Sequence, residues 1–72
     1  MTTRHKTKLV HENRYVAEVE VEVIEDETSW SPYLSLEDAQ RLDRVREALR
    51  SGDVKTAAQF GRVYTLSPVA VV

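Results

Sequence analysis

The residues from Tyr15 to Ile24 alternate apolar and acidic side chains, and this pattern constrains the fold more than any other part of the chain. Successive side chains of a β-strand point to opposite faces of a sheet, so a period of two predicts a strand with one buried face and one face in water. The rest of the chain must then cover the apolar face. The odd-numbered residues of that face are Tyr15, Ala17, Val19, Val21 and Val23, and the acidic residues opposite are Glu18, Glu20 and Glu22.

A second strand is expected just before this one. Residues 3–11 can alternate in the same way, and only the polar residues 12–14 separate the two segments. We predict a hairpin over residues 3–24 with a three-residue loop, in which Asn13 tolerates a left-handed conformation. A slip by one residue would lose both the charge matching between the strands and their common apolar face. The expected ion pairs join Lys8 to Glu18, Lys6 to Glu20 and Arg4 to Glu22.

Two helices are predicted in the second half of the chain. Ser35 suits an N-cap, and the apolar spacing predicts a helix from residue 36 to residue 50. Gly52 is expected to end this helix, and Asp53 to cap a shorter helix from Val54 to Phe60 that Gly61 stops. The apolar stripe of the longer helix comprises Ala39, Leu42, Val45 and Leu49.

The C-terminal residues have the composition of strands. Residues 62–66 are expected to form one, and the apolar residues 69–72 to pair in the sheet or to lie in a subunit interface. We therefore predict a single small α+β domain over residues 1–72. An N-terminal β-hairpin plus a C-terminal strand form a small antiparallel sheet, with one face covered by a long and a short helix. The C-terminal strand can join either edge of the hairpin.

Composition excludes several classes of site. The chain has no cysteine, so neither a disulfide scaffold nor a thiolate zinc site can support its core. No apolar run reaches the length of a membrane span, about 20 residues, and residues 1–8 lack the apolar segment of a signal peptide, which predicts a cytoplasmic protein. A chain of 72 residues is expected to be marginally stable, and self-association as a homodimer would add to its stability.

The titratable residues do not form a catalytic or metal-binding motif. His5 and His11 are six residues apart on one strand, about 20 Å, which precludes a shared metal ion. Neighbouring carboxylates on one face of a strand lie about 6.5 Å apart, too far to converge on one cation. The two glycines are too few for a phosphate-binding loop. We predict no catalytic, metal or cofactor residues and therefore a protein that is not an enzyme.

The charge distribution indicates two kinds of partner. The acidic strand can attract a basic protein, and the aromatic residues of the following loop can either anchor such a partner or cover the end of the core. Alternatively, the basic N-terminal strand with Arg4, Lys6 and Lys8 can bind nucleic acid in a small regulator, although the formal net charge of −2 gives no strong overall field. The partner-binding candidates are Glu18, Glu20, Glu22, Trp30 and Tyr33.

Three segments together carry a family resemblance. Residues 15–19, the acidic residues 25–27 and the capped segment 35–39 resemble the strand, acidic turn and helix start of HicB-like antitoxins, over residues 15–50. In size and charge layout the chain is also similar to small uncharacterised bacterial proteins that accompany toxin genes. The resemblance implies an antitoxin-like protein-interaction module without enzymatic activity, whose protein partner is a toxin.

Overall fold

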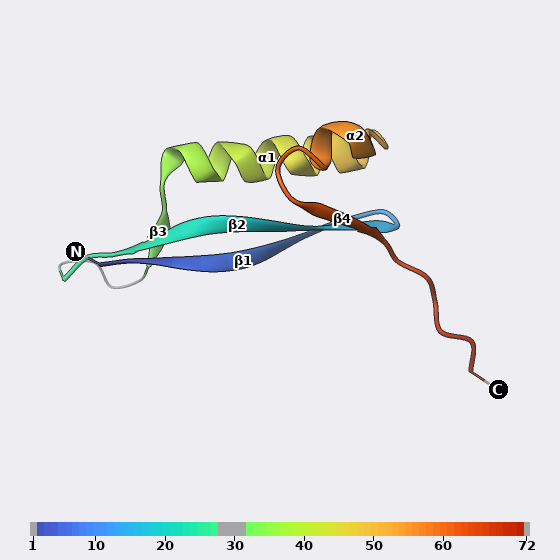
Figure 1. Ribbon diagram of the computed structural model, residues 1–72, viewed down its shortest axis with the longest axis horizontal. Coiled ribbons are helices and arrows are strands. Elements are labelled where there is room, and N and C mark those ends of the chain that lie inside the picture. Colours follow the sequence, from blue (N-terminus) through green and yellow to red (C-terminus); the bar gives the residue numbers. More distant parts are fainter. Residues whose placement is uncertain (1, 28–31, 72) are drawn as a thin grey trace.

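The computed structural model describes residues 2–27 and 32–71 and has two layers, an antiparallel sheet and a pair of helices (Figure 1). The sheet contains four strands, and both helices lie on one of its faces, which confirms the predicted α+β fold. In chain order the elements are β1 (Thr2–Glu12), β2 (Tyr15–Glu25), β3 (Tyr33–Leu34), α1 (Leu36–Arg50), α2 (Val54–Ala57) and β4 (Arg62–Thr65). In the part of the chain that is described, no helix has the length and apolar character needed to cross a membrane.

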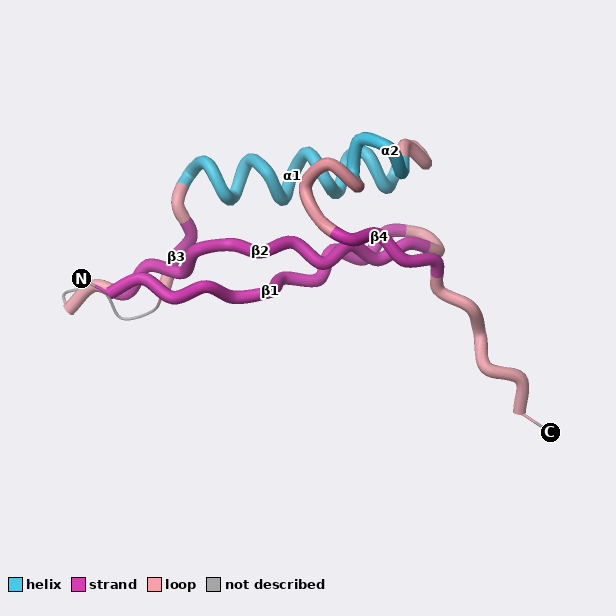
Figure 2. The backbone as a smooth tube through the Cα atoms, viewed as in Figure 1, coloured by secondary structure: helices cyan, strands magenta, loops and turns pink. Residues whose placement is uncertain are grey.

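Strand β2 lies at the centre of the sheet and pairs with every other strand (Figure 2). β1 takes one edge of β2 along its whole length. β3 pairs with residues 23–24 of β2 on the opposite edge, and β4 pairs with residues 15–18 on that same edge. The C-terminal strand therefore joins β2 and leaves the outer edge of β1 without a described strand.

The hairpin register differs from the predicted one. The turn contains Asn13 and Arg14, and Glu12 pairs with Tyr15, so the predicted three-residue loop is wrong. Asn13 adopts the expected left-handed conformation, with φ 56°. As a result the basic side chains of β1 do not face the acidic side chains of β2: Lys8 lies opposite Val19.

The register decides which side chain of β1 lies under the helices. Val10 lies opposite Ala17 under the helices and is 4% exposed, whereas Leu9 is 67% exposed on the other face. The predicted register would bury Leu9 there instead, so apolar burial does not separate the two registers, whereas a two-residue loop is the commonest hairpin connection. The shorter loop also brings Glu12 within 3.1 Å of Arg50 on α1.

The core lies between β2 and the helices. The odd-numbered residues of β2 from position 17 to position 23 are buried as predicted, and the residues of α1 that complete the core pack onto them. Tyr15 and Leu42 pack against this core but are only partly buried. The buried apolar residues are Val10, Ala17, Val19, Val21, Val23, Val45, Ala48, Leu49 and Ala57.

The helix ends follow the predicted capping signals. α1 has the predicted bounds, with the Ser35 hydroxyl accepting a hydrogen bond from the Asp38 N–H at 3.1 Å, and Gly52 follows its end with φ 80°. Asp53 caps α2 through the N–H of Thr56 at 3.2 Å. α2 ends at Ala57 rather than at the predicted Phe60. Residues 59 and 60 instead donate hydrogen bonds to the carbonyl groups three residues earlier, in tighter turns.

Helix α1 crosses the sheet obliquely. Near its beginning, Asp38 accepts a hydrogen bond from the backbone of Glu22 on β2. At its end, Arg50 pairs with Glu12 on β1. The helix therefore passes from the β3 edge towards the β1 edge and leaves the first half of β1 uncovered.

The C-terminal tail, residues 66–71, leaves the sheet after β4 and extends away from the helices (Figure 1). The Leu66 N–H still donates a hydrogen bond to the Arg14 carbonyl at 2.6 Å. Beyond it Val69 and Val71 are 86% and 92% exposed. The expectation that residues 69–71 pair in the sheet of the same chain is therefore wrong, because β4 reaches the first residue of β2 at Thr65 and the chain beyond it passes the hairpin turn.

Candidate functional site

The sheet face opposite the helices is uncovered in the described structure. This open face carries the even-numbered side chains of β2 and the odd-numbered side chains of β1, because directly opposed residues point to the same side. The acidic row, Glu18, Glu20 and Glu22, lies here as the alternation predicted. Glu20 and Glu22 are exposed, and Glu18 is half-buried.

The observed register leaves the acidic row without the cations expected beside it. Glu20 lies opposite Thr7, and Glu22 lies opposite His5. Glu18 lies between Leu9 on β1 and Arg62 on β4. Across residues 2–27 and 32–71 no salt bridge involves a carboxylate of the acidic row. Its negative charge is therefore available to a partner.

Two exposed tyrosines flank the acidic row. Tyr33 pairs with Ile24 at one end of β2, which places its ring on the open face, and it is 45% exposed. Tyr64 pairs with Val16 at the other end and is 42% exposed. The structure thus brings Tyr33 to the same face as the predicted acidic residues, and it adds Tyr64, which the sequence pattern did not single out.

Trp30 lies outside the described residues. Its predicted role in partner binding therefore remains a prediction.

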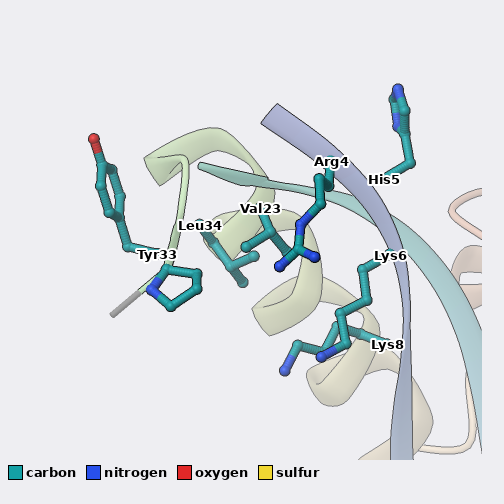
Figure 3. A pocket seen from close by; sticks show the side chains of 8 residues that line it. Arg4, His5, Lys6, Lys8, Val23, Tyr33 and Leu34 are labelled. Carbon is teal, nitrogen blue, oxygen red and sulfur yellow. The ribbon is translucent and has the colours of Figure 1, made fainter. Parts of the chain in front are cut away.

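A second feature lies on the helix side of β1. The side chains of Arg4, Lys6 and Lys8, here called the cationic row, border a pocket of about 480 Å³ between β1 and β3 (Figure 3). Arg4 forms an ion pair with Glu25. Lys6 and Lys8 form no salt bridge with any described residue. The remaining lining residues are His5, Val23, Pro32, Tyr33 and Leu34.

Figure 3 separates the two faces of the hairpin. The cationic row extends to one side, together with Val23 and Leu34, whereas the ring of Tyr33 and the imidazole of His5 point away from it. The prediction that the cationic row neutralises the acidic row is therefore wrong. The hairpin presents the acidic row on its open face and the cationic row on its helix side.

Asp38 is the buried ionisable residue of the described structure, 9% exposed. Its Oδ2 accepts the Glu22 N–H at 2.7 Å, and its Oδ1 accepts a hydrogen bond from Arg41 at 3.0 Å. The Glu22 N–H is the main cause that lowers the pKa of Asp38, and Arg41 adds to this effect against the opposing effect of burial. This carboxylate closes the gap between β3 and β4 on the β2 edge, so its role is structural.

The two histidines do not share a site. His5 lies on the open face opposite Glu22, and His11 lies at the turn, where its Nε2 is 2.9 Å from the Asn13 carbonyl oxygen. Among the described residues no cluster of three histidine, aspartate or glutamate side chains is arranged to hold a metal ion.

Comparison with protein families, with curated proteins and with solved structures finds no match to this chain. Its function must therefore be argued from its own geometry.

Proposed function

We propose that this chain is a non-enzymatic, antitoxin-like protein-interaction module whose open face binds a basic protein partner. The observation that supports it best is the acidic row, which forms no salt bridge with any described residue and lies between Tyr33 and Tyr64 on a sheet face that the described structure leaves uncovered. A toxin is the partner class that the HicB-like resemblance suggests.

The chemistry of the open face suits such a partner. Carboxylates spaced along a strand attract lysine and arginine side chains and speed association, while partly exposed aromatic rings supply contact area. β2 has eleven residues and is about 36 Å long, so the open face can seat an interface of ordinary size.

Neutralising the acidic row is expected to weaken capture of the partner. The variant Glu18→Gln/Glu20→Gln/Glu22→Gln, used as tagged bait in a nuclease-treated native extract, should recover about tenfold less partner than the wild type, a loss of about 1.4 kcal/mol. The quantity to measure is the amount of each protein recovered, by mass spectrometry.

The matched control removes the same charge from the exposed surface of α1, as Glu37→Gln/Asp43→Asn/Glu47→Gln. It should recover the partner at the wild-type level. Equal losses in both variants would mean that net charge, and not the open face, controls binding, and would contradict the proposal.

Self-association as a homodimer is the second part of the proposal, and the tail is the segment that supports it. Deleting residues 67–72 is expected to convert dimer to monomer in sedimentation equilibrium, because the exposed Val69 and Val71 would lose their apolar contacts. The far-UV circular dichroism should stay unchanged, since residues 67–71 belong to no helix or strand. A full-length chain that is monomeric at all concentrations would refute this part.

A nucleic-acid-binding regulator is the alternative function, and the cationic row is the observation that favours it. Lys6 and Lys8, which form no salt bridge within the described part of the chain, would contact successive phosphates. Binding of a labelled oligonucleotide that falls steeply with salt and disappears in Lys6→Gln/Lys8→Gln would support this alternative over the protein module.

A further inference from the structure

We propose that the outer edge of β1 is a strand-addition site for an extended acidic segment of a protein. This site is separate from the open face and goes beyond the function proposed above. The partner strand would run beside β1 with acidic side chains at alternate positions, next to the cationic row.

The backbone of β1 presents hydrogen-bonding groups on the outer side of the strand. In an antiparallel pair, residues alternate between bonding to the neighbouring strand and pointing their N–H and C=O groups away from it. The Glu22 N–H and the Glu20 carbonyl both bond to α1 side chains on the edge away from β1. Their partners across the hairpin, His5 and Thr7, must therefore point their own backbone groups outward, as must every odd-numbered residue of β1.

The outward groups form an unpaired edge. β1 is the terminal strand of the sheet, and no strand within the described residues pairs with its outer side. Residues 2–9 are all exposed. A row of free backbone donors and acceptors on an exposed edge is a template for an added strand.

The positive charge beside this edge determines which kind of strand can be added. The cationic row occupies alternate positions on the helix side, about 6.6 Å apart. Residues of an added strand that lie opposite Arg4, Lys6 and Lys8 repeat at the same spacing and point to the same side. Glutamate or aspartate at those positions would pair with Lys6 and Lys8 and would compete with Glu25 for Arg4, and the remaining positions would face His5, Thr7 and Leu9.

The same charges exclude a second copy of the chain from this edge. Two β1 strands paired by a two-fold axis run antiparallel with their helix sides on one face, so one cationic row would lie directly against the other. Like charges opposed across a sheet destabilise the pairing. The edge therefore rejects its own copy and selects an acidic strand.

The experiment titrates the full-length, isotope-labelled protein with a blocked nonapeptide that alternates threonine and glutamate. The control peptide replaces each glutamate with lysine. The amide chemical shifts should change saturably with the glutamate peptide and should not change with the lysine peptide. Hydrogen exchange should slow at the outward amides of Thr3, His5, Thr7 and Leu9 when the glutamate peptide is bound.

Thr7→Pro separates strand addition from charge attraction. It removes an outward N–H and leaves the ladder to β2 and all three cations intact, and proline is tolerated at such edge positions. Affinity for the glutamate peptide should fall at least about tenfold. Lys6→Glu/Lys8→Glu provides a second variant with an unmodified backbone, and it should bind the lysine peptide in place of the glutamate peptide.

Several results would overturn this proposal. A folded Thr7→Pro variant that binds the glutamate peptide with wild-type affinity would do so, as would equal binding of both peptides or no saturable binding of the glutamate peptide. An oligonucleotide that binds the cationic row more tightly than the glutamate peptide, without protecting the outward amides, would also overturn it. None of them bears on the acidic row, so failure here is distinguishable from failure of the proposed function.

Discussion

Replacing Gly61 with alanine is expected to destabilise the protein by about 3 kcal/mol or more, the upper end of the cost of overpacking. A Cβ atom at this position would lie 1.9 Å from the Glu18 carbonyl oxygen and 2.9 Å from the Glu18 carbonyl carbon. Both atoms belong to the backbone of the central strand, so no side chain can move to make room. The connection from α2 to β4 must shift instead, at the expense of the pairing between β4 and β2.

Gly52→Ala is the matched control, because a Cβ there meets nothing within 4 Å. Its φ of 80° costs an alanine about 1–2 kcal/mol through backbone strain alone. Urea unfolding of both variants should therefore give a clearly larger loss of unfolding free energy for Gly61→Ala. Equal losses would show that the close approach to Glu18 is not what the glycine provides.

The second large effect is expected at Asp38. In Asp38→Ala the Glu22 N–H, which is part-buried, loses its acceptor, and Arg41 loses its carboxylate. Leaving a buried donor unsatisfied costs about 1–3 kcal/mol. Asp38→Asn keeps an amide oxygen for the Glu22 N–H and should lose distinctly less in the same urea experiment. If the asparagine variant is as unstable as the alanine variant, the charge matters and the hydrogen bond does not.

The pH dependence of this effect has a definite sign. The folded state lowers the pKa of Asp38, chiefly through the Glu22 N–H. The carboxylate therefore contributes its full stability above the unfolded pKa, about pH 4, and loses it as the pH falls through the lower folded pKa. The stability difference between wild type and Asp38→Asn should be largest near pH 7 and should shrink towards pH 2.5 as the carboxylate is protonated.

Local patterns predicted the elements better than the contacts between them. The alternation along β2 and the caps at Ser35 and Asp53 depend on neighbouring residues, and they predicted strand, helix starts and buried face. The hairpin register depends on the length of the turn and on whether Val10 or Leu9 packs under the helices, which only the packed structure decides. From the sequence, Gly61 could be predicted only to stop a helix, because Glu18, which it contacts, is far from it along the chain.

Only part of the candidate site was predicted correctly, for the same reason. The period of two placed the acidic row on one face, and this is correct. A register shift of one residue moves a whole strand to the other face, so the error in the loop also misplaced Arg4, Lys6 and Lys8. Tyr33 was named for its residue type, and only its pairing with Ile24 in β3 shows that it borders the acidic row.

The central position of β2 has a consequence for how the molecule opens. Each strand pairing in the described sheet joins β2 to one neighbour, so β3 or β4 can detach without breaking the contact between β1 and β2. Such a sheet opens in separable cooperative units, with its peripheral strands leaving first. The hairpin closes over a short sequence distance and can form early in folding, before the distant β4 arrives. Among the hydrogen-bonded amides of the sheet, native-state hydrogen exchange should therefore be slowest at the odd-numbered amides of β2 and fastest in the peripheral strands β3 and β4, with the hairpin as the last unit to unfold.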